Sequence, residues 1–484
     1  MRGGPGDDDT RPAAVVLIDG EHYPPVVRDT LRLLGERYTL VAALFLGGGE
    51  KLRDGQAADL DELYGLPVAR VPAAAGAGQG AGEGEGEGPA LAALREALAR
   101  ALADTGARTV IDVSDEPVLG YRERFQLISV AMSWGARYVG ADFEFSPQPL
   151  ERLSGKPSLA IIGTGKRVGK TAVSGFFGRR LAARLGPDRV VIVAMGRGGP
   201  AAPQVLYGGE KLGSEALLAA SRQGLHAASD YFEDAVLAGV TTIGCRRCGG
   251  GLAGAAVDSN VDRATGLVDD LPVALAVWEG SGSAIPPVRA DAVVCVTSAG
   301  QPADYITGYL GTYRMLISDA VFLTMCEPPF CDGACLDALR REIVSVNPAI
   351  DVIPTVFRPR PVEPVAGQRV AFFTTAPRAG AAVLVDHLRE AHDADVTLVS
   401  TDLARRPALL DDVAAAAGRA DVYLTEIKAA AVDVVAEAAA AAGKRLVFCD
   451  NEPVAVDGRD LAAVVDGLAN LAERRFSERE EVAP

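Results

Sequence analysis

The stretch GTGKRVGKTAVSGFFGRRL, residues 163–181, decides the fold, because a glycine-rich turn leads directly into apolar residues at helical spacing. Residues 158–162 (SLAII) form the short apolar run of a buried strand immediately before it. Strand, glycine-rich turn and helix in this order predict a phosphate-binding loop. The backbone N–H groups of such a turn point inward at an anion, and the helix N-terminus adds positive potential. We therefore predict a nucleotide site here.

Individual side chains of the loop supply the chemistry that a bound nucleotide requires. Lys170 is expected to reach the β- and γ-phosphates, and the Thr171 hydroxyl is expected to bind Mg²⁺. Thr164 stands where the usual pattern has its first glycine, with a glycine on each side. The predicted nucleotide-binding residues are Gly163, Thr164, Gly165, Lys166, Arg167, Val168, Gly169, Lys170 and Thr171.

Two carboxylates elsewhere in the chain complete a predicted magnesium site. Asp230 opens the acidic segment SDYFEDAVLAG, and the apolar run 272–278 (PVALAVW) leads into Glu279. Hydroxyl, carboxylate, phosphate and water oxygens are the ligands that Mg²⁺ prefers. Thr171, Asp230 and Glu279 are therefore the predicted metal ligands. The alternative for Asp230 is a simple helix N-cap.

Two segments that combine arginine and glycine predict a second, polyanionic ligand. They are 195–200 (MGRGGP) and 245–251 (CRRCGGG), and each is expected as a loop after a strand. Arginine presents a planar fork to phosphate oxygens, and neighbouring glycines let the backbone approach the same anion. The alternative is that these are solvated loop arginines. The predicted catalytic residues are Lys166, Lys170, Arg197, Arg246 and Arg247.

Glu327 follows the predicted strand 320–324, at the place where P-loop proteins recognise the nucleotide base. Its carboxylate could accept from an adenine amino group, but the residue types do not separate ATP from GTP. Lys428, one of few lysines, could close over the site or simply begin a helix.

The cysteines favour reduced structural thiols. Cys245 and Cys248 have the spacing of a metal or redox pair, and Cys326, Cys331 and Cys335 could add ligands. No second pair has the two-residue gap, so a bound metal is the less favoured interpretation.

Alternating apolar runs and helical stretches predict an α/β protein with three regions. We expect an N-terminal α/β domain over 1–152, a P-loop domain over 153–362 and a C-terminal α/β domain over 363–484. Residues 73–89, rich in glycine and glutamate, cannot bury enough apolar surface to fold and are expected to be a mobile insertion. Acidic residues at strand ends of the first region, such as Asp19 and Asp112, could bind a cation, contact the ligand, or serve as caps and exposed loop acids.

The net charge of −16 repels nucleic acid and anionic lipid, so we expect neither as a partner. No run of about 18 apolar residues occurs, and residues 1–10 are polar and acidic, unlike a signal peptide. A cytoplasmic protein is therefore expected. The apolar first sheet could serve subunit association, and we expect a homodimer.

The loop pattern GT-x-x-x-VGKT, the Ser-Asp at 229–230 and the Glu-Gly-x-Gly at 279–282 resemble dethiobiotin synthetase and its P-loop relatives. Dethiobiotin synthetases carry a lysine where this chain has Val191, so a biotin-pathway substrate is not expected. The resemblance implies a central P-loop NTPase domain of the dethiobiotin-synthetase-like type, which we expect to be flanked by N- and C-terminal Rossmann-like domains.

The phrases LIDGEHYPP (17–25), AMGRGGP (194–200) and GCRRCGGGLAG (244–254), together with the loop, resemble the cyclic 2,3-diphosphoglycerate synthetase family over nearly the whole chain. That family uses ATP to close 2,3-bisphosphoglycerate into an intramolecular phosphoanhydride, releasing ADP and phosphate. The resemblance therefore implies ATP and Mg²⁺ as cofactors and 2,3-bisphosphoglycerate as the substrate.

Two other functions fit the residues. One is a different ATP-dependent ligase or kinase acting on a phosphorylated small acid. The other is a nucleotide-switched ATPase of the partitioning or metal-delivery type, with Cys245 and Cys248 as the delivery pair.

Overall fold

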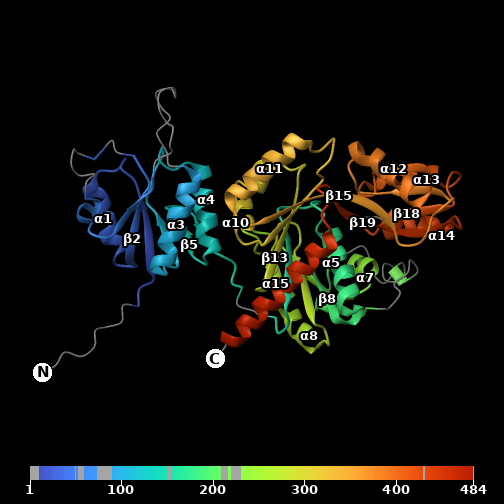
Figure 1. Cartoon of the computed structure of the whole chain (residues 1–484), viewed down its shortest axis with the longest axis horizontal. Helices are drawn as coiled ribbons and strands as arrows, with labels where there is room; N and C mark the ends of the chain where they lie inside the picture. The colour runs from blue at the N-terminus through green and yellow to red at the C-terminus, as the bar shows by residue number, and fades with distance from the viewer. Residues whose placement is uncertain are drawn as a thin grey trace. The chain divides into compact units, whose positions relative to one another are not determined.

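The computed structural model describes residues 10–48, 51–52, 59–72, 90–150, 154–208, 216–217, 219, 230–428 and 431–482. These residues divide into two compact units (Figure 1). The first unit comprises Met1–Gln148, Ala303–Ile317 and Ser345–Pro348, and the second comprises Pro149–Pro302, Ser318–Val344 and Ala349–Pro484. The predicted insertion 73–89 and Ser229 lie outside the described residues.

The first unit is a six-stranded sheet in the order β3-β2-β1-β4-β5-β6. Only the β5–β6 pair among these strands is antiparallel. Its strands are β1 (Ala13–Ile18), β2 (Thr39–Phe45), β3 (Val68–Arg70), β4 (Thr109–Asp112), β5 (Arg137–Val139) and β6 (Glu144–Phe145). Its helices are α1 (Pro24–Leu34), α2 (Leu60–Tyr64), α3 (Leu91–Thr105), α4 (Tyr121–Ser133), α9 (Ala303–Ile306) and α10 (Gly311–Leu316).

The phosphate-loop part of the second unit is a parallel sheet in the order β10-β8-β12-β7-β13-β14-β15. Strands β7 and β8 are buried along their whole length, as expected for a parallel sheet covered on both faces. The strands are β7 (Ser158–Gly163), β8 (Val190–Gly196), β10 (Thr241–Cys248), β12 (Leu275–Glu279), β13 (Ala292–Ser298), β14 (Ala320–Thr324) and β15 (Asp351–Pro361), with β9 (Gln204–Leu206) and β11 (Asp258–Ser259) at the edge. The helices are α5 (Lys170–Leu185), α7 (Asp230–Ala238), α8 (Ala264–Asp270) and α11 (Gly333–Val346).

Strand β15 joins this sheet to the C-terminal region. Its first half pairs with β14 and its second half pairs antiparallel with β19, so the described strands of the second unit form one continuous sheet. The remaining strand order is β19-β18-β16-β17. These strands are β16 (Arg369–Phe373), β17 (Asp395–Ser400), β18 (Val422–Glu426) and β19 (Arg445–Ala455), and the helices are α12 (Ala381–His392), α13 (Arg406–Ala416) and α14 (Glu437–Ala441). Arg179 of α5 contacts Asp450 at 2.5 Å, which ties the phosphate-loop helix to β19.

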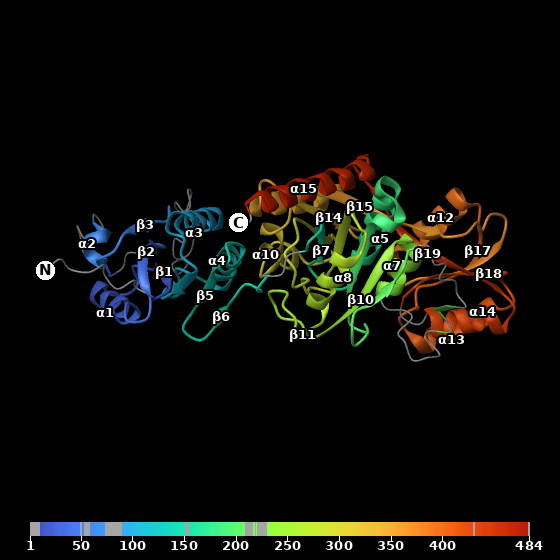
Figure 2. The same cartoon turned by 90° about the horizontal axis from the view of Figure 1, so that it is seen from below.

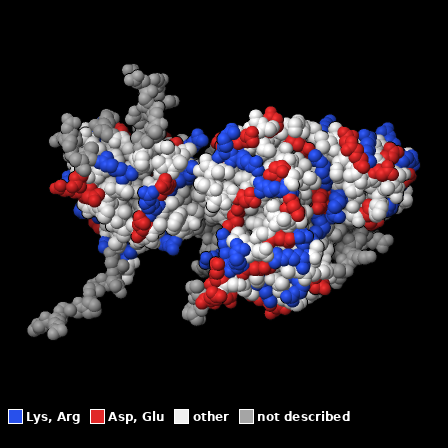
Figure 3. Space-filling view, in the orientation of Figure 1, with Lys and Arg blue, Asp and Glu red and all other residues white. Residues whose placement is uncertain are grey.

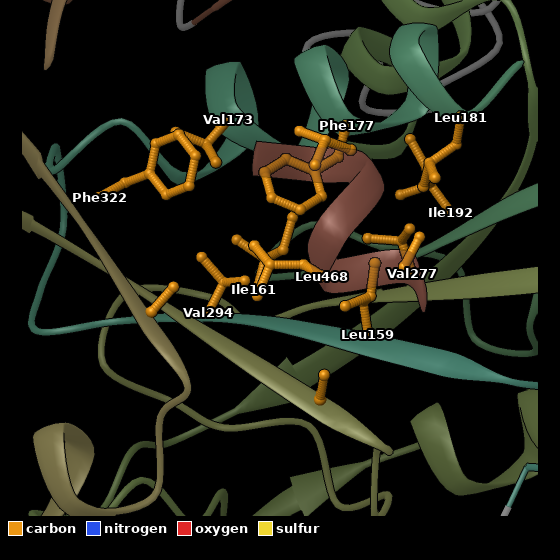
Figure 4. Close-up of a cluster of buried hydrophobic side chains, with 14 of the residues drawn as sticks. Leu159, Ile161, Val173, Phe177, Leu181, Ile192, Val277, Val294, Phe322 and Leu468 are labelled. Carbon is orange, nitrogen blue, oxygen red and sulfur yellow. The ribbon is translucent and has the colours of Figure 1, made fainter. Parts of the chain in front are cut away.

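Helix α15 (Leu461–Val482) returns from the C-terminal region to the phosphate-loop core. Figure 2 shows it running alongside α5, and Figure 4 shows Leu468 among Phe177, Ile161 and Leu159. The sequence-based boundary assigned this helix to the third domain. An amphipathic pattern shows that a helix has a buried face but not which core it covers, so the sequence could not distinguish these packings.

Ion pairs connect α15 to the phosphate-loop part of the second unit. Arg475 contacts Asp319 at 2.8 Å, Arg479 contacts Asp291 at 2.8 Å, and Arg180 of α5 pairs with Asp466. Acidic and basic side chains accordingly lie close together along this helix in Figure 3. Among the described residues, no helix combines the length and apolarity needed to cross a bilayer.

Candidate functional site

The parallel register brings the ends of four strands to one edge of the sheet. Glu279 at the end of β12 lies opposite Ile161 of β7 and Ala194 of β8, and Gly163 at the end of β7 lies opposite Val296 of β13. Ligands of open parallel sheets bind at this carboxyl edge. The loops that follow these strands therefore form the candidate active site.

The phosphate loop closes tightly around Lys170. Its ammonium Nζ donates to the Gly165 carbonyl at 2.8 Å, so the side chain folds back over the turn. Gly169 has a φ of +96°, and a Cβ there would lie 2.3 Å from Cζ of Phe357. Only glycine fits this position. Burial lowers the pKa of Lys170 to about 8, while the carboxylates of Glu279 and Asp230 act in the opposite direction.

Thr164, the departure from the usual loop pattern, connects the loop to the end of β13. Its hydroxyl donates to Oε1 of Gln301 at 2.7 Å and lies 2.8 Å from the Thr297 hydroxyl. A glycine could make neither contact. Lys166 and Arg167 are exposed at the outer part of the loop, where Arg167 has a φ of +65°.

The three predicted metal ligands lie near Lys170. Glu279 is 1% exposed, and neither of its carboxylate oxygens has a hydrogen-bond partner among the described residues. Burial and the charge of Asp230 raise the pKa of Glu279 to about 7, while the nearby Asp234 and Thr171 oppose this shift. Unpartnered buried oxygens beside a threonine hydroxyl fit the donor set of Mg²⁺.

Within the described residues, no group of three or more histidine, cysteine, aspartate or glutamate side chains is arranged as a complete metal cage. A magnesium ion here would therefore depend on the Thr171 hydroxyl, two carboxylates and oxygens of its ligand. Asp230 lies in the first turn of α7, and burial raises its pKa. The positive groups that oppose this shift are Lys170, Lys428, Arg197 and Arg247.

Two acidic side chains that no sequence motif singled out, Glu233 and Asp234, lie beside this site. Glu233 is 4% exposed and contacts Nζ of Lys428 at 3.3 Å. Both carboxylate oxygens of Asp234 are buried, and neither has a hydrogen-bond partner in the part of the chain that the structure describes. Helical spacing was the available signal, because residues three and four positions after Asp230 share its face of the helix. No sequence pattern indicates that Lys428, almost two hundred residues later, reaches α7.

Lys428 comes from the C-terminal region, where only Ile427 separates it from the end of β18. Burial alone would lower the pKa of Lys428, but the carboxylates of Glu233 and Glu426 raise it above its ordinary value. Burial raises the pKa of Glu233 to about 8, against the opposing charge of Lys428. The structure brings Lys428 to the acidic side chains of α7. Of its two interpretations, this position favours a lysine that closes over the site.

Arg197 and Arg247 converge on Gly282. A Cβ at Gly282, where φ is +62°, would lie 2.8 Å from Nη2 of Arg197 and 3.3 Å from Nη2 of Arg247. Arg247 donates to the carbonyls of Gly249 at 2.6 Å and Ser281 at 2.8 Å. Desolvation and the charge of Arg197 lower the pKa of Arg247. Two guanidinium groups held together in this way are suited to a multiply charged anion.

Arg246 does not join this pair. The segment CRRC was expected as a loop after a strand, but it is the end of β10 itself. Side chains alternate along a strand, so Arg246 leaves β10 on the face opposite to Arg247 and is exposed. Cys245 and Cys248 are separated for the same reason: Cys245 is buried, whereas Cys248 is exposed. The structure therefore does not bring these two thiols together as a metal or redox pair.

Glu327 follows β14 as expected, but its carboxylate is already engaged. Arg358 of β15 donates to both of its oxygens at 2.7 Å.

In the first unit, Asp19 accepts from the backbone N–H of Asp115 at 2.7 Å and lies 2.8 Å from Nδ1 of His22. Asp112 accepts from the Tyr138 hydroxyl at 2.8 Å. Asp19 and Asp112 therefore hold loops of the first unit in place.

Comparison with known proteins gives three family matches in chain order. Models described as the N-terminal, P-loop and C-terminal domains of cyclic 2,3-diphosphoglycerate synthetase match residues 13–146, 158–356 and 361–452. A protein of that name from Rubrobacter xylanophilus is 50% identical over 461 residues, covering 95% of this chain and 97% of the relative. The chain belongs to the cyclic 2,3-diphosphoglycerate synthetase family.

Other relatives with this name come from Thermococcus gammatolerans, at 44% identity covering 93% of this chain and 96% of the relative, and Methanothermus fervidus, at 40% identity covering 92% and 93%. Among solved structures, a hydrogenase maturation factor from Archaeoglobus fulgidus matches 42% of this synthetase-family chain and 82% of its own. Its TM-score of 0.27 and identity of 14% carry no argument.

Proposed function

We propose that this chain uses ATP to close 2,3-bisphosphoglycerate into its cyclic intramolecular phosphoanhydride, releasing ADP and phosphate. The observation that carries the proposal is the convergence of Arg197 and Arg247 beside Gly282, because both guanidinium groups also act on Asp230, a neighbour of the loop lysine Lys170. A nucleotide and a second polyanion then lie next to each other at one sheet edge. The names of the relatives supply the identity of that polyanion.

The chemistry consists of two displacements at phosphorus. An oxygen of one substrate phosphate attacks the γ-phosphorus of ATP, the bond to the β-phosphate oxygen breaks, and ADP leaves. The second substrate phosphate then attacks the phosphorus of the first, which closes the ring and expels inorganic phosphate. Little covalent help from protein groups is needed for phosphoryl transfer, so positioning and charge compensation dominate.

Particular residues would perform these tasks. Lys170 and Lys166 would offset charge on the transferred phosphoryl group, while Arg197 and Arg247 would hold two mutually repelling phosphates together. Thr171, Asp230 and Glu279 would hold Mg²⁺, which supplies further charge neutralisation. Arg246 is left outside this group because of its position on the other face of β10.

The adenine base would lie near the segment after β14. Glu327 could accept from its amino group while still paired with Arg358, since each carboxylate oxygen has two lone pairs.

We also propose that the P-loop domain is of the dethiobiotin-synthetase-like type. The parallel order β3-β2-β1-β4-β5 supports a Rossmann-like first domain, and β17-β16-β18-β19 supports a related third one.

The decisive experiment is incubation with ATP, Mg²⁺ and 2,3-bisphosphoglycerate, followed by phosphorus NMR. We expect new phosphoanhydride resonances together with ADP and phosphate, and a much slower appearance of all three with the Lys170→Ala variant. ATP hydrolysis without a cyclic product, at a rate independent of the acid, would contradict the proposal. It would instead favour a nucleotide-switched ATPase, whereas phosphorylation of a different acid would favour another kinase or ligase.

Positional isotope exchange tests the order of steps. Exchange in ATP that depends on 2,3-bisphosphoglycerate supports initial attack on the γ-phosphate.

We also propose a homodimer in the cytoplasm, for which the exposed apolar Val26 and Leu33 of α1 offer a contact surface. Light scattering of the purified chain would give its mass in solution, and a monomeric mass would contradict the dimer.

A further inference from the structure

Two cysteines after β14 lie closer together than two unbonded sulfur atoms normally approach. The Sγ atoms of Cys331 and Cys335 are 2.7 Å apart. In a disulfide the same distance is about 2.05 Å. Cys331 precedes α11, and Cys335 lies in its first turn, where the Asp332 carboxylate accepts from the Cys335 backbone N–H at 2.8 Å. Loop and helix therefore already bring the two sulfur atoms within reach of each other.

We propose that Cys331 and Cys335 form a reversible disulfide by exchange with a low-molecular-weight disulfide. This modification site goes beyond the proposed synthetase activity. The pair differs from Cys245 and Cys248, which have the more familiar spacing but lie on opposite faces of β10.

Exposure assigns different tasks to the two thiols. Cys335 is partly exposed and lies in the first turn of α11. Cys331 is 4% exposed, and burial raises the pKa of its thiol to about 12. Cys335 is therefore the thiol that meets the oxidant, and Cys331 is the one that resolves the adduct.

The exchange balances without any further reagent. The Cys335 thiolate attacks one sulfur of the small disulfide, forming a mixed disulfide and releasing one thiolate. The Cys331 sulfur then attacks the Cys335 sulfur, its proton passes to the departing second thiolate, and the protein disulfide is complete. One small disulfide has become two small thiols, and the two protein sulfurs have been oxidised.

The disulfide would join α11 to the segment that we assign to the base. The backbone N–H groups of Phe330 and Cys331 donate to the Glu327 carbonyl at 3.0 and 3.1 Å. Phe330 also faces Gly300, next to Gln301, which accepts from Thr164 of the phosphate loop. Restricting this segment would limit movement of Glu327 toward a nucleotide. This consequence rests on the proposed function, and we expect ADP to bind roughly fivefold more weakly to the oxidised protein.

The chemical test does not depend on nucleotide binding. Reduced full-length protein is treated with oxidised glutathione, remaining thiols are alkylated after denaturation, and the tryptic peptide 315–340, which contains Cys326, Cys331 and Cys335, is analysed by mass spectrometry. We expect this peptide to lose two hydrogens, with only Cys326 alkylated. Cys326→Ser and Cys248→Ser should leave the disulfide intact, and dithiothreitol should reverse it.

Two single variants test the separate tasks. Cys331→Ser should retain one glutathione on Cys335, whereas Cys335→Ser should form no adduct in this peptide. Alkylation of all three cysteines in the treated wild-type peptide, or a disulfide that includes Cys326, would overturn the assignment. Calorimetric titration with ADP, before and after oxidation, tests the coupling separately. An intact disulfide with unchanged ADP affinity would refute the link to the nucleotide while leaving both the redox site and the synthetase proposal standing.

Discussion

Replacing Arg247 with alanine should weaken binding of the phosphorylated acid by roughly 10- to 150-fold. The guanidinium group is held by the carbonyls of Gly249 and Ser281, so it faces Arg197 before any ligand arrives. A hydrogen bond to a charged group contributes about 1.5–3 kcal/mol. Each tenfold change in affinity corresponds to about 1.4 kcal/mol, which gives this range.

Calorimetric titration of 2,3-bisphosphoglycerate in the presence of ADP would measure the loss, and the KM for ATP should change little. Arg246→Ala is the matched control, because it removes the same side chain from the next position of the same strand. Its exposed position predicts a change of about 0.5 kcal/mol or less, about twofold in affinity. Equal losses in the two variants, or a loss in Arg246→Ala alone, would refute the argument from strand alternation.

Three further predictions concern the loop, the metal and the core. Lys170→Ala should lower ATP turnover by roughly 10²–10³-fold without changing the circular dichroism spectrum, because its contribution is electrostatic; turnover near wild type would exclude Lys170 from catalysis. Glu279→Gln should raise the Mg²⁺ concentration needed for half-maximal turnover by at least about tenfold, and an unchanged requirement would remove Glu279 from the metal site. Phe177→Ala should destabilise the second unit by about 3–5 kcal/mol in urea unfolding, because the side chain is fully buried. Leu410→Ala, at a position that is 53% exposed, should change stability by no more than about 0.5 kcal/mol, and equal effects would contradict this account of the core.

Local patterns were sufficient to predict the phosphate loop. The buried strand β7, the turn and helix α5 follow one another in the chain, so propensity, glycine placement and apolar spacing all describe the same short segment. The strand ends that carry Glu279 and Arg197 could be predicted for a related reason. A buried parallel strand is a continuous apolar run, and the polar residue that ends it marks the carboxyl edge.

Contacts between distant segments could not be predicted in this way. Lys428 reaches Glu233, and Thr164 reaches Gln301, but no local pattern connects the members of either pair. The segment CRRC shows a different limit. Its glycines predicted a loop, yet pairing with β8 and β11 extends β10 through both cysteines, and this extension assigns the two arginines to opposite faces.

The return of α15 to the phosphate-loop core has a consequence for biosynthesis. Its side chains cover β7, β13 and α5, yet the ribosome makes it after the whole of β16 to β19. In a nascent chain that ends before Leu461, the apolar side chains that α15 normally covers would be exposed to solvent. Chaperones recognise this kind of surface. Competence to hold a nucleotide should therefore arise late in translation, only after residues 461–482 have emerged.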